Sequence, residues 1–150
     1  MLNSQKNGEK LETPCLIPTS NDAQIARWRM EKYGQLLSDI INRTEVADII
    51  DYGCGKAPVA RYLRVNHHVR VTLYDRDVLK YSDMPTPQPL VSCINALHGD
   101  MELSGAVAIL DGIKALATEA ALIVVRAGAV KNNWWIYEIN KRFDIHALTN

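Results

Sequence analysis

The feature that most constrains the fold is an apolar run that ends in an acidic residue and passes directly into a glycine turn. The run covers 46–50, the acidic residue is Asp51, and glycines occupy both ends of 53–55. Apolar residues then recur at helical spacing after Pro58. A strand, a tight turn and a helix in this order form the first half of a βαβ unit, whose turn presents backbone N–H groups at the carboxyl edge of a parallel sheet. We therefore expect a ligand site at this turn.

The pattern of small residues in the turn separates the possible ligand classes. A dinucleotide fingerprint, G-x-G-x-x-G, would place its third glycine at position 58, which is Pro58. A phosphate-binding P-loop needs a lysine followed by serine or threonine, whereas Lys56 is followed by Ala57. Both departures argue against a nicotinamide cofactor and against a nucleoside triphosphate. Pro58 suits the first position of a helix, where a missing N–H group has no effect.

The stretch Asp51-x-Gly53-x-Gly55-x-Ala57 resembles motif I of the class I S-adenosylmethionine-dependent methyltransferases. In that family an acidic residue starts the motif, and the third glycine is sometimes another small residue. Asp75 ends the next alternating apolar run, about 20 residues after the glycines, where an acidic side chain can accept hydrogen bonds from both ribose hydroxyls. The resemblance covers 33–145 and implies S-adenosylmethionine as cofactor, with S-adenosylhomocysteine as its product.

The chain of 150 residues is long enough for one compact domain. Residues 1–20 are interpreted as a flexible N-terminal arm, and 21–150 as a single methyltransferase-like domain. Apolar runs alternate with helical patterns, which predicts an α/β fold with a mostly parallel sheet flanked by helices. The expected strands are 46–51, 69–75, 90–95 and 120–125, and the expected helices are 21–42, 58–65, one capped by Asp100 that runs to 117, and one from 133. The resemblance implies a Rossmann-like class I methyltransferase fold, abbreviated because 76–89 contains three prolines where typical members have another helix and strand.

The resemblance also assigns a cofactor site at the carboxyl ends of the strands. Backbone groups of Gly53 and Gly55 are expected to face the methionine part, Asp75 to hold the ribose, and Arg76 to flank the adenine. The full set of expected cofactor-binding residues is Asp51, Tyr52, Gly53, Gly55, Asp75, Arg76, Asn95, Ala96 and Leu97.

The segment 95–100 is expected near the reacting methyl group. The residues Tyr74-Asp75, Tyr81 and Pro85-Thr86-Pro87 resemble a branch of small phage and bacterial methyltransferases, many of which have D-V-L-E-H-I at the position of this segment. In this chain Asn95 replaces the aspartate, and His98 comes one place earlier than the histidine of that motif. A base is needed only if the acceptor must first lose a proton, and an imidazole titrates near neutral pH. Asn95 and His98 are therefore the candidate catalytic residues, although His98 also fits an ordinary loop histidine.

Charge and composition exclude several kinds of partner. Seventeen basic and seventeen acidic residues give a net charge of zero, which argues against strong attraction to nucleic acid or anionic lipid. The sequence has no apolar run long enough for a transmembrane helix and no C-x-x-C pair, which predicts a reduced, cytoplasmic protein. The methyltransferase interpretation adds a small-molecule substrate as the expected partner. His67 and His68 lack partners at ligand spacing, so they are interpreted as a solvated turn and no metal site is expected. The oligomeric state is not indicated.

Three functions agree with these patterns to different degrees. The main hypothesis is S-adenosylmethionine-dependent methyl transfer to an unidentified small-molecule substrate. The alternative is a degenerate relative that binds S-adenosylmethionine or S-adenosylhomocysteine without efficient transfer, which the altered segment 95–100 favours. A nicotinamide-dependent oxidoreductase is a further alternative, and Pro58 argues against it.

Overall fold

The computed structural model describes residues 21–126 and 134–145, except for the side chains of 21–29, 31, 32 and 95. The expected N-terminal arm, 1–20, lies outside this description. The elements in chain order are α1 (Asn21–Thr44), β1 (Asp48–Tyr52), α2 (Pro58–Asn66), β2 (Arg70–Tyr74), the 3-10 helix η1 (Leu79–Tyr81), β3 (Gln88–His98), α3 (Leu103–Leu116), β4 (Ala117–Arg126) and α4 (Trp134–Asn140).

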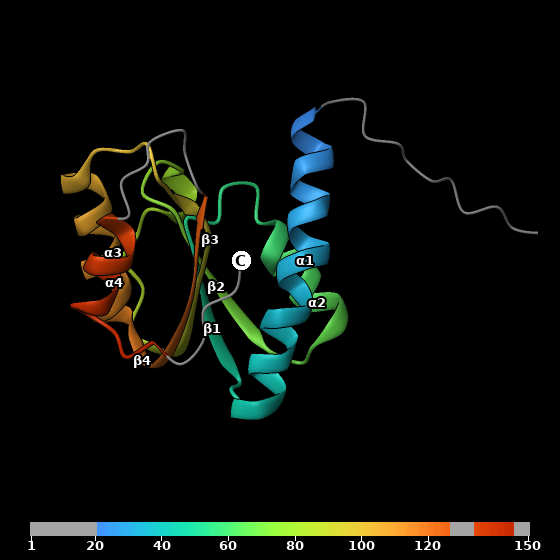
Figure 1. Ribbon diagram of the computed structural model, residues 1–150. Coiled ribbons are helices and arrows are strands. Elements are labelled where there is room, and N and C mark those ends of the chain that lie inside the picture. The colour runs from blue at the N-terminus through green and yellow to red at the C-terminus, as the bar shows by residue number, and fades with distance from the viewer. Residues whose placement is uncertain (1–20, 127–133, 146–150) are drawn as a thin grey trace, which may run out of the picture.

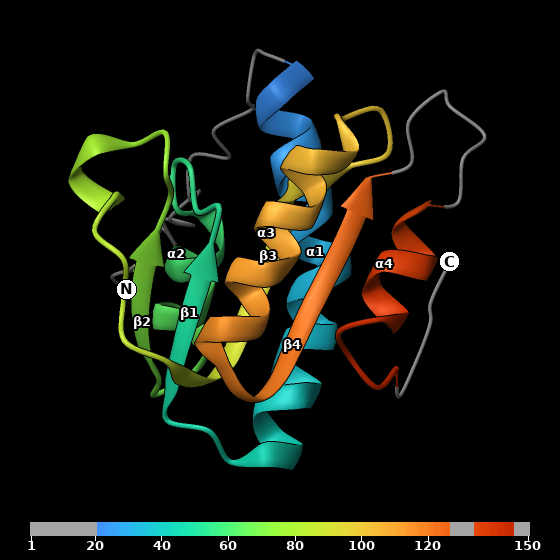
Figure 2. The same cartoon turned by 90° about the vertical axis from the view of Figure 1, so that its left-hand side faces the viewer.

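Within the described residues, four strands form one sheet in the order β2-β1-β3-β4, and every neighbouring pair is parallel. Helices α1 and α2 cover one face of the sheet, and α3 and α4 cover the other (Figure 1). This arrangement is α/β and Rossmann-like, and the alternation of apolar runs and helical patterns predicted its parallel sheet between helices. The arrowheads in Figure 2 mark the carboxyl ends of the strands, and the β1–α2 turn lies at that edge. No helix in the described part of the chain has the length and apolar character needed to cross a membrane.

Strand β1 supplies both halves of the core because successive side chains of a strand point to opposite faces. Ile49 packs in the cluster beneath α1 and α2, and Ile50 packs in the cluster beneath α3; neither side chain is exposed. Buried members of the first cluster include Leu37, Ile41, Val59, Leu63, Leu90 and Ile94. Those of the second include Tyr52, Tyr74, Val91, Cys93, Leu97, Leu110 and Ile113. A strand buried on both faces explains the unbroken apolar run before Asp51.

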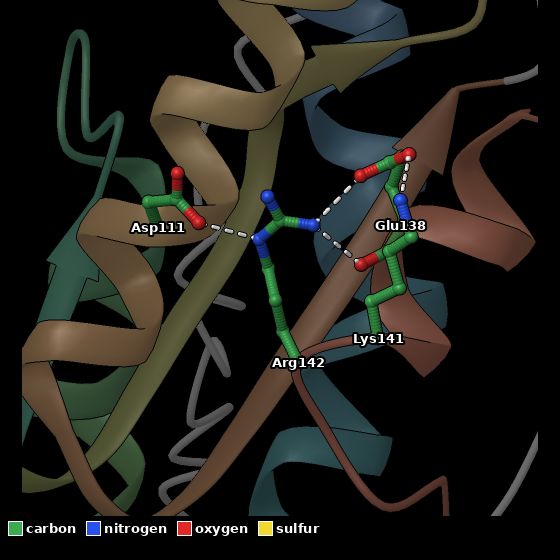
Figure 3. Close-up of polar contacts among 4 residues, drawn as sticks. All are labelled: Asp111, Glu138, Lys141 and Arg142. Carbon is green, nitrogen blue, oxygen red and sulfur yellow. Dashed lines mark hydrogen bonds and ion pairs between the residues drawn. The ribbon is translucent and has the colours of Figure 1, made fainter.

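Helix α4 is attached to α3 by a group of charged side chains in which Glu138 and Arg142 are largely buried and Asp111 and Lys141 are exposed (Figure 3). Arg142 donates from Nε to Asp111 Oδ1 at 2.5 Å and from Nη1 to Glu138 Oε2 at 2.8 Å. Lys141 Nζ lies 3.3 Å from the other oxygen of Glu138. The hydrogen bond from Arg142 lowers the pKa of Glu138, which keeps this buried carboxylate ionised. Paired and hydrogen-bonded charges of this kind fix the orientation of one helix on another.

Two glycines inside helices make room for tyrosine rings. An added Cβ at Gly34 of α1 would lie 2.8 Å from the ring of Tyr62, and one at Gly112 of α3 would lie 2.6 Å from the hydroxyl of Tyr52. Helix α1 continues through Gly34 without interruption. Close packing therefore explains why residues of poor helix propensity occupy these positions.

The largest difference from the sequence-based expectation concerns 88–103. Strand β3 continues to His98, whereas a strand ending at Asn95 was expected. The expected helix cap at Asp100 is wrong, because α3 begins at Leu103 and Asp100 bonds to His98 instead. Tertiary pairing with β4 extends the strand, since His98 still has a partner in Arg126.

Candidate functional site

The turn between β1 and α2 has an unusual backbone in which alternate residues are left-handed. The φ angles are +71° at Gly53, +50° at Gly55 and +56° at Ala57. Pro58 disfavours a right-handed helical conformation at the preceding residue, which agrees with the conformation of Ala57. The position at which the motif usually has a third glycine therefore retains the conformation that glycine adopts most readily.

Hydrogen bonds attach this turn to the end of β2. The N–H groups of Gly53 and Cys54 donate to the carbonyl oxygen of Tyr74 at 2.8 Å and 3.2 Å. The N–H of Gly55 donates to Asp75 Oδ2 at 2.8 Å, while Asp75 Oδ1 accepts from the N–H of Asp77 at 2.9 Å. Asp75, expected as the ribose ligand, therefore joins two loops of the protein. An ionised carboxylate has about four lone-pair positions, so two acceptor positions remain for a ligand.

The two glycines of the turn have different surroundings. An added Cβ at Gly53 would lie 2.5 Å from the Cβ of Ala96, so this glycine allows β3 to approach the turn closely. At Gly55 no described atom lies within 4 Å of the same position, and the residue is exposed. Packing inside the protein therefore explains why position 53 requires glycine. Gly55 instead leaves the backbone open to an approaching molecule.

An irregularity in β3 brings Ala96 to the turn. Cys93 pairs with Ile123 and Leu97 pairs with Val125, so β3 contains two more residues than β4 over the same interval. Such bulges redirect a strand locally and are frequent beside binding sites. Asn95 lies in this bulge, and its side chain is outside the described part of the structure. The alternation of apolar residues gave no indication of the bulge.

Asp51 lies in the core directly beneath the turn. The residue is 2% exposed, and its Oδ2 atom has no hydrogen-bond partner among the described residues. Burial raises the pKa of this carboxyl to about 7, although the N–H of Ala60 on α2 opposes the rise. Buried polar atoms are nearly always hydrogen-bonded in folded proteins. The free oxygen of Asp51 is therefore the clearest unsatisfied acceptor at this edge of the sheet.

Two other expected cofactor-binding residues, Tyr52 and Leu97, have their side chains in the core, whereas a third, Arg76, is exposed. The side chain of Tyr52 is in the core, with its ring 5.0 Å from that of Tyr74, and burial raises the pKa of its hydroxyl to about 12. Leu97 is 1% exposed in the same cluster. Tyr52 and Leu97 can therefore contact a ligand only through the backbone. Arg76 is exposed and lies 3.7 Å from Asp77.

His98 has a partner that the sequence analysis did not identify. Its Nδ1 atom lies 3.0 Å from Asp100 Oδ1, and both side chains are partly exposed. The hydrogen bond from His98 lowers the pKa of Asp100. The sequence did contain a signal for this hydrogen bond, because the histidine and the aspartate are two residues apart. The pair was missed because Asp100 was interpreted as a helix cap.

The opposite edge of the sheet holds a separate group of polar residues. His67 Nε2 lies 2.7 Å from Ser38 Oγ, which lies 3.2 Å from the hydroxyl of Tyr62. The interpretation of His67 as a solvated turn residue is therefore wrong, whereas His68 is exposed. A hollow of about 360 Å³ adjoins these histidines at the amino ends of the strands. No group of three or more histidine, cysteine, aspartate or glutamate side chains within the described residues is arranged to hold a metal ion.

Comparison of the chain with models of known protein families finds no match, and comparison with curated proteins also finds none.

Proposed function

We propose that this chain binds S-adenosylmethionine at the carboxyl edge of its sheet and transfers the methyl group to a small-molecule acceptor. The observation that carries the proposal is the β1–α2 turn. Three alternate residues in it are left-handed, and its open position at Gly55 is hydrogen-bonded to Asp75, which directly follows the adjacent strand β2. A ligand at this position would meet backbone N–H groups and an acidic side chain together, as in nucleotide-like sites of Rossmann-like folds.

The chemical character of the edge fits this cofactor. S-adenosylmethionine has two ribose hydroxyls and a cationic amino group as donors, and a positive sulfonium. The residue that would receive such donors is Asp75, which has acceptor positions left over. The carboxyl of Asp51 lies in the core beneath the turn. Gly55 leaves space for close approach to the backbone.

The residues of the chain would mainly hold and orient the reactants. When bound, the cofactor supplies an electrophilic methyl group on sulfur, so alignment of the acceptor is the main requirement. Gly53, Gly55 and Asp75 would hold the cofactor, with Arg76 beside it. His98, at the end of β3, would face the acceptor, and Asn95 remains the other candidate catalytic residue.

Binding without efficient transfer is the second candidate function. Leu97, expected beside the reacting methyl group, is packed in the core and leaves fewer side chains of 95–98 to contact an acceptor. Cofactor affinity would depend on the turn and Asp75, and these are unaffected by this difference. The two functions therefore share the binding site and differ only in turnover.

The test of the site is Gly55→Asn. Asparagine tolerates the left-handed conformation better than most residues, so the fold should persist while the side chain occupies the open space. Glu45→Asn is the matched control, because Glu45 also has a positive φ, +53°, and follows α1, near the amino end of β1. In calorimetry the wild type and Glu45→Asn should bind S-adenosylmethionine and S-adenosylhomocysteine, and Gly55→Asn should not. A hundredfold excess of ligand over Kd should stabilise the wild type by about 2.7 kcal/mol.

Binding of NAD or ATP in place of the methyl donor would contradict the proposal, as would equal affinity in Gly55→Asn. Incubation with labelled methyl donor and a mixture of small metabolites separates the two candidate functions. Label transfer by the wild type, absent from Gly55→Asn, supports an enzyme. Binding without transfer supports the second function.

A further inference from the structure

The turn that follows β3 is held rigidly on two sides. The N–H of Gly99 donates to the carbonyl of Arg126 at the end of β4 at 2.7 Å. The carbonyl of Gly99 accepts from Trp134 Nε1, at the start of α4, at 3.2 Å. The ion pairs of Arg142 in turn hold α4 on α3 (Figure 3). The backbone next to His98 is therefore held in position by hydrogen bonds to β4 and α4.

The hydrogen bond between His98 and Asp100 determines where the imidazole carries its proton. An ionised carboxylate can only accept, so the 3.0 Å contact requires the proton on Nδ1 of His98. In the neutral ring, Nε2 then has a free lone pair. The side chain of His98 is 38% exposed, so the ring is accessible from solvent.

The position of His98 relative to the glycine turn follows from the alternation of side chains in β3. Leu97 packs in the cluster beneath α3, so His98 leaves the strand on the other face, which α1 and α2 cover. The glycine turn runs into α2 on this same face (Figure 1). Ala96, which packs against the cluster beneath α3, lies beside the turn at Gly53, and His98 is the last residue of β3. His98 thus lies at the edge where the methyl donor is proposed to bind.

We propose that Asp100 is a positioning residue that presents Nε2 of His98 as a general base, and that the methyl acceptor is a small phenol. This inference rests on the proposed function. A phenol, with a pKa of about 10, is mostly protonated at neutral pH and is a poor nucleophile until a base removes its proton. A thiol ionises more readily and needs a base less. An alkyl hydroxyl is a much weaker acid than a phenol, so its proton passes to an imidazole less readily.

In the proposed step the phenol loses a proton and gains a methyl group. The O–H bond of the phenol breaks, its electron pair stays on oxygen, and the proton passes to Nε2 of His98. The oxygen bonds to the methyl carbon while the carbon–sulfur bond of S-adenosylmethionine, the co-reactant, breaks with its electron pair on sulfur. The imidazolium returns its proton to solvent, and Asp100 stabilises the charge in the interval.

The first readout is independent of activity. Nitrogen-15 NMR of the free protein, at a pH where the imidazoles are neutral, should show the His98 proton on Nδ1. His98→Gln identifies the signal by its loss, and Asp100→Ala should move the proton toward Nε2. His68→Gln is the matched control at the far edge of the sheet and should leave the His98 signal unchanged. A proton on Nε2 in the wild type, or no change in Asp100→Ala, would overturn the inference.

The second readout compares phenol with 4-nitrophenol, a stronger acid that is largely ionised in a mildly alkaline assay. With labelled methyl donor, His98→Gln should lower transfer to phenol by about 10²–10⁴-fold and transfer to 4-nitrophenol much less. Asp100→Ala should lower transfer to phenol by a smaller factor, and His68→Gln should have no effect.

Two results would overturn the inference and leave the proposed binding site standing. One is an equal loss of transfer rate with both acceptors in His98→Gln. The other is a wild type that binds the methyl donor but transfers no methyl group to phenol. Failure of the wild type to bind S-adenosylmethionine in calorimetry would instead overturn the proposed function.

Discussion

The close approach of Gly53 to Ala96 gives a quantitative test of how β3 meets the glycine turn. In Gly53→Ala the new Cβ would lie 2.5 Å from the Cβ of Ala96, and neither atom can move by rotation of a side chain. Overpacking of this kind destabilises by about 1–3 kcal/mol. The left-handed φ of +71° adds about 1–2 kcal/mol for a residue with a Cβ. We expect a total loss of roughly 2–5 kcal/mol in the free energy of unfolding.

A second substitution separates the steric contribution from the backbone contribution. Ala96→Gly alone should destabilise by about 0.5–1 kcal/mol, since glycine weakens a strand. In the double variant the overlapping atom is gone, so only the backbone strain at position 53 and the glycine penalty at position 96 remain. The double variant should therefore be about 1–3 kcal/mol more stable than the sum of the single effects predicts.

Urea denaturation at 25 °C, followed by circular dichroism, measures all four proteins. Equal slopes with shifted midpoints would show that the substitutions change stability rather than the extent of unfolding. Effects that add within about 0.5 kcal/mol would refute the contact between Gly53 and Ala96. A loss below about 1 kcal/mol in Gly53→Ala would refute the left-handed conformation as well.

Two further predictions concern the core. Burial raises the pKa of Asp51 from 3.8 to about 7, so the folded state keeps a proton that the unfolded chain releases, and this carboxyl makes the protein less stable as pH rises through that interval. Between about pH 4 and pH 8, the free energy of unfolding of Asp51→Asn, measured with urea, should rise by up to about 4 kcal/mol relative to that of the wild type. If the two proteins show parallel curves of unfolding free energy against pH, the prediction is contradicted. In α3, Gly112→Ala should lower the melting temperature because the new Cβ would lie 2.6 Å from the Tyr52 hydroxyl, and Tyr52→Phe should restore part of the loss. Gly105→Ala in the same helix meets only Met101, at 3.7 Å, and should raise the melting temperature; equal shifts for both glycines would contradict the packing argument.

The sequence alone determined the fold class and the position of the candidate site. Apolar runs that alternate with helical patterns require a parallel sheet between helices, because both faces of such strands must be buried. The glycine turn after Asp51 and the acidic residue at the end of the next strand were identified from local spacing. Local chemistry was sufficient here, since a strand end, a left-handed turn and a proline at a helix start are all decided by neighbouring residues.

Only the tertiary structure decided what the residues at this edge contact. Gly53 is needed because β3 bulges toward it at Ala96, and no pattern in either segment indicates the other. Tyr52 and Leu97 turn into the core because strand alternation continues past the point at which the sequence suggested that each strand ends. Asp100 bonds to His98 rather than capping α3 because pairing with β4 carries β3 as far as His98. These outcomes depend on packing between segments distant in the chain, which the spacing of residues along one segment does not encode.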